Sequence, residues 1–326
     1  MAVLGLSVVG GAIRSIDRPD QPLSVALGRA LRSLPRGQPV SILVHGYKFS
    51  PERVRKNPHQ LIFAPRTQHS NPKYMSWPEG LGFHSPLDGL CIGFGWPASD
   101  LDHPGPGING FHRVYRAAPQ AGRHLADLIE AVRAAAPDCE VDLFTHSLGA
   151  RVVLSALPWV DDNAVGRVIL MGAAEFDRPA AEFLAANHTA RVFNITSRDN
   201  RLYDALLTRF GPTSGRHMHP LGRGIAHLAR NAVDIRLDDP GHLKLLKRRG
   251  VTLPRQSPKI CHWSFYTRPG AFKLYAEILR NPHNWTLPEL RAEVYDLSSP
   301  GFRLRLPGQT PPSGAGGVAA RPLTGR

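Results

Sequence analysis

Short apolar runs recur along this chain and predict the strands of a sheet. Most of them show no alternation of apolar and polar residues, which is typical of strands that are covered on both faces. A strand or strand pair is predicted over residues 3–13. Further strands are predicted at 40–44, 90–95, the run that starts at Val141, 167–171, 190–195 and 260–265, the last of the series.

Between these runs, apolar residues recur every three or four positions and predict helices. The clearest helix starts at about Pro119, where Leu125, Leu128, Ile129 and Val132 form one apolar stripe. The other helices are predicted over 23–34, directly after Ser147, near 180–186, over 203–210 and over 272–279. Such alternation predicts an α/β fold in which a mostly parallel sheet carries helices on both faces.

Two segments lack this alternation and are rich in Pro, Gly, His and Arg. We expect residues 50–88 and 211–258 to be irregular, cap-like insertions that frame the substrate pockets of a single domain over residues 1–300. Residues 301–326 are rich in Pro and Gly and hold no acidic residue, which predicts a flexible basic tail.

The composition adds a strong positive charge, +14 at neutral pH. This charge favours contact with a membrane surface, but no zinc-finger or RNA-recognition pattern accompanies it, so we expect no specific nucleic acid. No run approaches the roughly 18 apolar residues that span a bilayer. Three scattered cysteines form no disulfide framework, so we expect a soluble protein in a reducing cytoplasm.

A candidate nucleophile, Ser147, lies where one predicted strand passes into a helix. The apolar run that starts at Val141 ends in the letters THSLG, a pattern that places a serine on a sharp strand–turn–helix elbow. The N–H of Leu148, at the start of the helix, can donate to an oxyanion. The sequence departs from the usual G-x-S-x-G pattern at Thr145, whereas Gly149 is retained.

A serine nucleophile needs a base and an acid that orients it, and on this kind of scaffold both follow the serine along the chain. His262, near the last predicted strand, is the candidate base, with His242 as its rival. Asp199, after the next-to-last predicted strand, is the candidate acid. Asp177 and Asp204 are the alternative acids.

The second oxyanion donor is expected in the loop after residues 40–44. His45-Gly46 allows the backbone to approach a ligand closely, and the N–H of Tyr47 is the candidate donor.

Two other patterns do not support a bound group. The letters GFGWPA at 93–98 lack the helix that a dinucleotide site requires. The histidines of the second cap-like segment lack a second pair of ligands at zinc spacing; they are His217, His219, His227 and His242. We therefore expect neither a cofactor nor a metal.

The ordered motifs together resemble those of α/β-hydrolases. They are HGY at 45–47, WPAS at 96–99, Tyr115, THSLGARV at 145–152, SRD at 197–199 and His262. The sequence is most similar to the DUF900-type bacterial serine hydrolases, esterase- or lipase-like proteins of unassigned substrate, over about residues 38–282. This resemblance implies the α/β-hydrolase fold, with Ser147, Asp199 and His262 as the catalytic triad.

The expected activity is hydrolysis of a small carboxylic ester through an acyl-enzyme. Thioester hydrolysis or acyl transfer on the same triad is one alternative. A catalytically silent fold that binds acidic partners through its positive charge is the other.

Overall fold

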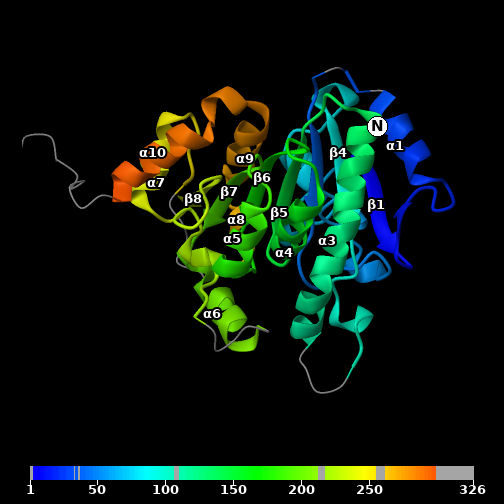
Figure 1. The fold of residues 1–326 in the computed structure, drawn as a ribbon, viewed down its shortest axis with the longest axis horizontal. Helices are drawn as coiled ribbons and strands as arrows, with labels where there is room; N and C mark the ends of the chain where they lie inside the picture. Colours follow the sequence, from blue (N-terminus) through cyan, green and yellow to red (C-terminus); the bar gives the residue numbers. More distant parts are fainter. Residues whose placement is uncertain are drawn as a thin grey trace, which may run out of the picture.

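The computed structural model describes residues 3–32, 34–35, 37–105, 110–211, 217–254 and 261–298 (Figure 1). The predicted tail at 301–326 lies outside them. The described residues contain one eight-stranded sheet with the strand order β2-β1-β4-β3-β5-β6-β7-β8. Every neighbouring pair is parallel except the β1–β2 hairpin, which confirms the predicted sheet type.

The strands match the apolar runs closely up to β7. Their bounds are β1 Val3–Val9, β2 Ala12–Ser15, β3 Val40–Val44, β4 Leu90–Gly95, β5 Val141–His146, β6 Val165–Met171, β7 Arg191–Thr196 and β8 Ala232–Arg236. The α-helices are α1 Leu23–Arg32, α2 Trp77–Gly80, α3 Gly110–Ala135, α4 Gly149–Ala156, α5 Asp177–Ala185, α6 Arg201–Phe210, α7 Pro240–Arg248, α8 Ser264–Thr267, α9 Ala271–Arg280 and α10 Leu287–Ser298.

Helices cover both faces of the sheet (Figure 1). On one face α1, α3, α4 and α5 pack against strand residues such as Ile42 and Leu143. On the other face α7, α9 and α10 pack against residues such as Phe144 and Val233, together with buried side chains from 61–83. None of the helices in the described ranges is both long and apolar enough to cross a bilayer.

The prediction of a last strand at 260–265 is wrong for residues 261–265, the part of it that the structure describes. Residues 262–263 form a turn and 264 begins α8, whereas the last strand is β8 in a segment predicted to be irregular. The charged residues Asp234 and Arg236 interrupt the apolar pattern of β8, so the sequence does not predict this strand. The carboxylate of Asp234 is nevertheless accommodated, because it accepts hydrogen bonds from Asn194 Nδ2 and from the Ile225 N–H.

Helix α3 begins nine residues before the predicted start at Pro119 and runs through that proline. A proline inside a helix leaves the carbonyl four residues earlier without its N–H donor. Here that carbonyl belongs to Tyr115, and Arg151 Nε of α4 donates to it over 2.9 Å. A side chain from the neighbouring helix thus replaces the missing backbone bond.

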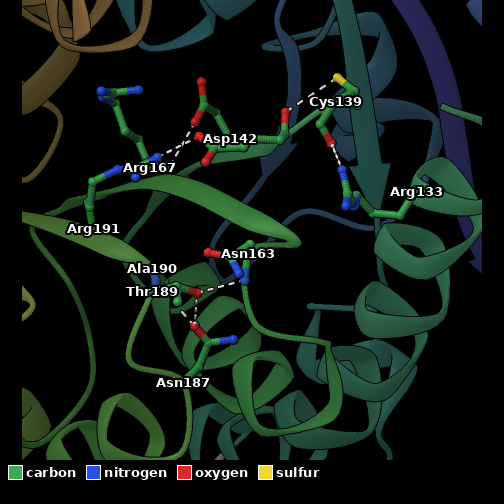
Figure 2. Close-up of polar contacts among 10 residues, drawn as sticks. Arg133, Cys139, Asp142, Asn163, Arg167, Asn187, Thr189, Ala190 and Arg191 are labelled. Atoms are coloured by element: carbon green, nitrogen blue, oxygen red, sulfur yellow. Dashed lines mark hydrogen bonds and ion pairs between the residues drawn. The ribbon is translucent and has the colours of Figure 1, made fainter. Parts of the chain in front are cut away.

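The edge at which the strands begin carries a separate set of polar contacts (Figure 2). Asp142 Oδ1 accepts from the Arg167 N–H over 2.7 Å, and burial raises the pKa of this carboxyl to about 7. In the loops before β6 and β7, the Asn163 N–H donates to Thr189 Oγ1 over 2.8 Å, and that hydroxyl donates to Asn187 Oδ1. These contacts join the strand starts at the edge opposite the Ser147 elbow.

Candidate active site

Ser147 lies on a tight elbow between β5 and α4. Its φ of +58° is in the left-handed region, which a serine adopts only when its surroundings enforce it. Its N–H donates to the Met171 carbonyl over 3.0 Å, and its carbonyl accepts from the Ala174 N–H over 2.9 Å. The backbone is therefore tied to the end of β6 on both sides, and the elbow expected from the sequence is present.

Two glycines make the elbow sterically feasible. A Cβ atom at Gly46 would lie 2.8 Å from the His146 carbonyl oxygen and 2.9 Å from Ser147 Cβ. A Cβ at Gly149 would lie 2.6 Å from the His45 carbonyl oxygen. The loop after β3 therefore packs directly against the elbow, and only glycine fits at either contact.

Thr145 replaces the usual first glycine without disturbing this packing. Its hydroxyl donates to the Val44 carbonyl over 2.8 Å, across the β3–β5 pair. A Cβ at Gly149 would lie 2.3 Å from that same hydroxyl. The space left by Gly149 therefore accommodates the threonine side chain.

His262 lines the same cavity as Ser147. Its Nδ1 lies 2.6 Å from Asn200 Oδ1, its ring stacks on Tyr203 at 4.2 Å between centroids, and it packs on His146 at 4.4 Å. Burial holds the pKa of His262 well below its ordinary value of 6.5, and the neighbouring His146 lowers it further. The imidazole is therefore neutral near pH 7.

A second hydrogen bond fixes the orientation of Asn200. Its Nδ2 donates to Asp204 Oδ1 over 2.9 Å, and an ionised carboxylate can only accept. Asn200 Oδ1 must then face His262, so His262 Nδ1 carries the proton and Nε2 is the basic atom. Burial raises the pKa of Asp204 to about 6, against the opposing effects of Asn200 and Arg223.

The structure does not bring Asp199 to His262; its neighbour Asn200 holds that position. Asp199 lies in a 3-10 turn, η7 (Arg198–Asn200), where its N–H donates to Ser197 Oγ. Burial raises the pKa of Asp199, and a hydrogen bond with the Ser264 hydroxyl opposes the rise. Asn200 is not among the residues predicted from the sequence, because an acid was expected at this position. Asp204, one of the alternative acids, is hydrogen-bonded to Asn200.

The other rivals named from the sequence serve the scaffold. Asp177 Oδ1 accepts from the backbone N–H groups of Arg178 and His219. His242 is buried at the start of α7, and its Nδ1 accepts from the Arg236 N–H. Neither side chain lines the cavity that holds Ser147.

His45 supports the loop that contacts the elbow. Its Nδ1–H donates to the Gly46 carbonyl over 2.9 Å, and its Nε2 accepts from the Trp96 N–H. Burial lowers the pKa of His45 to about 3, so the ring stays neutral. It positions Gly46 and the following residue, Tyr47.

The two predicted oxyanion donors come from the loop after β3 and from the start of α4. Tyr47 lines the cavity, and the Leu148 N–H precedes the first turn of α4. Among the hydrogen bonds of the described residues, neither N–H has an acceptor, whereas the next N–H, of Lys48, donates to Ala98. Both N–H groups therefore have no hydrogen-bond acceptor among the described residues, and their role as oxyanion donors stays a prediction.

A buried ion pair links α4, the helix that follows the elbow, to the loop after β6. Arg151 Nη1 of α4 lies 2.5 Å from Glu175 Oε2, and Tyr115 donates to Glu175 Oε1 over 2.5 Å. Glu175 is fully buried, so both bonds are strong and costly to break. They join α3, α4 and the loop after β6.

The cavity has a volume of about 540 Å³ and mostly apolar walls. It lies at the edge where α6 and the start of α3 extend past the sheet (Figure 1). Its apolar lining is Tyr47, Phe49, Phe111, Ala173, Ala174, Leu206, Leu207, Phe210 and Trp263. The described lining thus comes from the loops after β3 and β6, from α6, the start of α3 and residues 262–263. None of the residues described in 50–88, 217–254 or at 211 belongs to it.

No protein-family model matches the sequence, and no curated protein is significantly similar to it. Among solved structures, the chain is similar to the acylaminoacyl peptidase of Pyrococcus horikoshii in its orthorhombic crystal form. That match has a TM-score of 0.35 and 10% sequence identity, and it covers 79% of this chain and 38% of that one. The strand order, the helices on both faces and the serine elbow after β5 together identify the α/β-hydrolase fold.

Proposed function

We propose that the protein is a serine hydrolase that cleaves a carboxylic ester through an acyl-enzyme on Ser147. The observation that carries this proposal is the cavity shared by Ser147, on its strained elbow, and His262, whose Nδ1–H is held by Asn200. A constrained serine beside a neutral, oriented imidazole is the arrangement that nucleophilic catalysis requires.

In the proposed reaction, Ser147 Oγ attacks the ester carbonyl while His262 Nε2 takes its proton. The N–H groups of Tyr47 and Leu148 stabilise the negative oxygen of the tetrahedral intermediate. His262 then gives its proton to the leaving alcohol, and the acyl group stays on Ser147. Water, deprotonated by the same histidine, releases the acid.

We assign the orienting role to Asn200, with Asp204 behind it, and not to Asp199. The imidazolium that forms during the attack is stabilised by the Asn200 carbonyl, which the Asp204 carboxylate polarises through Nδ2. In this arrangement Asn200 lies between the negative charge of Asp204 and the His262 ring. Asp199 remains the alternative and is tested separately.

The acyl group of the substrate is proposed to be apolar. The walls near Ser147 carry aromatic and aliphatic side chains from α6 and from the start of α3, and burial of such a chain contributes about 0.8 kcal/mol per CH₂. We therefore expect longer acyl chains to react faster until the cavity of about 540 Å³ is filled.

A fluorophosphonate probe tests the nucleophile. The wild-type protein should be labelled, Ser147→Ala should not, and Ser70→Ala, an exposed serine elsewhere, should be labelled like the wild type. Equal labelling of wild type and Ser147→Ala would overturn the proposal. A series of p-nitrophenyl and thioester substrates with increasing acyl length then identifies the preferred bond and chain length.

A further inference from the structure

A second cavity, also of about 540 Å³, adjoins the first, and Asp204 is the residue that the two linings share. Its walls are more polar than those of the first and come from the end of β7, from η7 and α6, from β8, and from a 3-10 turn, η8 (Leu221–Arg223). Its lining is Thr196, Ser197, Arg198, Arg201, Asp204, Ala205, Thr208, Pro220, Gly222, Arg223, Gly224, Asp234 and Arg236. Nothing in the proposed ester hydrolysis uses this space.

Four arginines line this second cavity, and its carboxylates do not pair with all of them. Arg198 and Arg236 share one acid, Asp238, at 3.3 Å and 3.8 Å. Arg201 donates through Nε to the Arg198 carbonyl, and Arg223 Nη1 lies 3.0 Å from His219 Nδ1. In the described part of the chain, neither Arg201 nor Arg223 has a carboxylate oxygen within 4.0 Å.

The acids of this cavity are already engaged by the protein. Asp234 accepts from the N–H groups of Ile225 and Ala226 and from Asn194 Nδ2. Asp204 accepts from Asn200, and a Cβ atom at Gly222 would lie 2.1 Å from its Oδ2, so a glycine is needed to admit the carboxyl group. These donors are neutral, so both carboxylates keep their charge, but the lining holds more arginines than aspartates and its net charge is positive.

We propose that this cavity binds a tetrahedral oxyanion, a phosphate or sulfate group, through Arg201 and Arg223. Guanidinium groups suit this ligand because their planar donors form paired, charge-assisted hydrogen bonds with its oxygens. Arg198 and Arg236 add positive potential at the rim. Neither Ser147 nor His262 lines this cavity, so the oxyanion binds apart from the ester.

Calorimetry on the Ser147→Ala protein tests the site without any ester turnover. Sodium sulfate should bind saturably, whereas sodium chloride at the same ionic strength should not. Because hydrogen bonds to charged groups are worth about 1.5–3 kcal/mol, Arg201→Gln and Arg223→Gln should each weaken sulfate binding about tenfold or more. Arg230→Gln, an exposed arginine outside the cavity, should leave the affinity unchanged.

Two further titrations separate the sources of the oxyanion. Tighter binding of phenyl phosphate than of inorganic phosphate supports a phosphorylated organic ligand, and equal binding supports the free ion. Either result supports the site if both arginine variants weaken it. Absence of saturable sulfate and phosphate binding, or equal binding by Arg201→Gln, Arg223→Gln and the parent, overturns the inference, whatever the esterase assays show.

Discussion

Replacement of Asn200 tests the most specific feature of the proposed site. Asn200→Ala removes the acceptor that holds His262 Nδ1–H at 2.6 Å and the donor that reaches Asp204 at 2.9 Å. The ring then loses the hydrogen bond that keeps its proton on Nδ1, and Nε2 is no longer fixed as the basic nitrogen. We expect kcat to fall while KM changes little, because the apolar substrate walls stay intact.

The magnitude follows from the two hydrogen bonds. A bond to a group that becomes charged is worth about 1.5–3 kcal/mol, and His262 carries its positive charge only during the reaction. A loss of about 2–3 kcal/mol from the transition state corresponds to a fall in kcat of about 30- to 150-fold. The assay is the hydrolysis of a p-nitrophenyl ester at pH 8, where His262 is neutral.

Asp199→Asn is the matched control, since it changes the neighbouring residue and leaves the Asn200 bonds in place. It should alter kcat less than about threefold. Asn200→Asp alone places the new carboxyl group against that of Asp204, and the two must share a proton. This variant should therefore have a lower kcat. Combining Asn200→Asp with Asp204→Asn exchanges the amide and the carboxylate, restores both hydrogen bonds and should recover activity.

The reasoning is refuted if Asp199→Asn lowers kcat as much as Asn200→Ala does. In that case Asp199 orients His262 in solution, as the sequence alone suggested. It is also refuted if Asn200→Ala retains full activity while it remains folded by circular dichroism.

Three other predictions concern pH, packing and stability. Because burial depresses the pKa of His262, its neutral form persists into acid, and kcat/KM should begin to fall only at a pH clearly below 6.5; a limb at or above that value contradicts the burial argument. Gly46→Ala would press a methyl group against the elbow and should lower kcat about 100- to 1,000-fold by displacing the oxyanion donors. Gly28→Ala, on α1, would place its methyl group at an ordinary contact distance of 3.7 Å from Arg32 Nη1 and should change neither activity nor folding. The pKa of Asp142 is raised in the folded state from 3.8 to about 7, so the folded protein binds this proton more tightly and stability falls as pH rises between those values. Asp142→Asn should therefore raise the free energy of unfolding at pH 8 by roughly 2–4 kcal/mol and leave it nearly unchanged at pH 3.5, as measured in urea; a lower value at pH 8 would show that the ionised carboxylate is stabilising.

The sheet could be predicted from the sequence wherever a strand is buried on both faces. The runs at 40–44 and 90–95 contain only apolar or small residues, so their sequence is sufficient. β8 was missed because it lies at the edge of the sheet and includes Asp234, whose partners come from remote residues. The local sequence pattern cannot show that a buried charged residue will accept hydrogen bonds from donors far away in the chain.

The site could be predicted in part for the same reason. The elbow at Ser147 could be predicted because it is a local strand–turn–helix pattern. His262 was predicted from its order along the chain, and it lines the cavity of Ser147 although the described residues around it form no strand. Asn200 was missed because one residue of rotation in η7 decides whether residue 199 or 200 faces the histidine. That rotation depends on how η7 and α6 pack against the segment that carries His262, which is a tertiary effect.

The hydroxyl of Thr145 has a consequence for how proteins with this elbow are recognised from their sequences. Its side chain occupies the space that Gly149 leaves open, and its bond to Val44 joins two central strands. A Cβ at position 149 would also lie 2.6 Å from the His45 carbonyl oxygen, so the second glycine of the motif is needed in any case, whereas the first position accepts threonine. Sequence searches that demand both glycines would pass over chains of this kind, whereas a pattern that couples a small or hydroxyl residue to the retained glycine would find them.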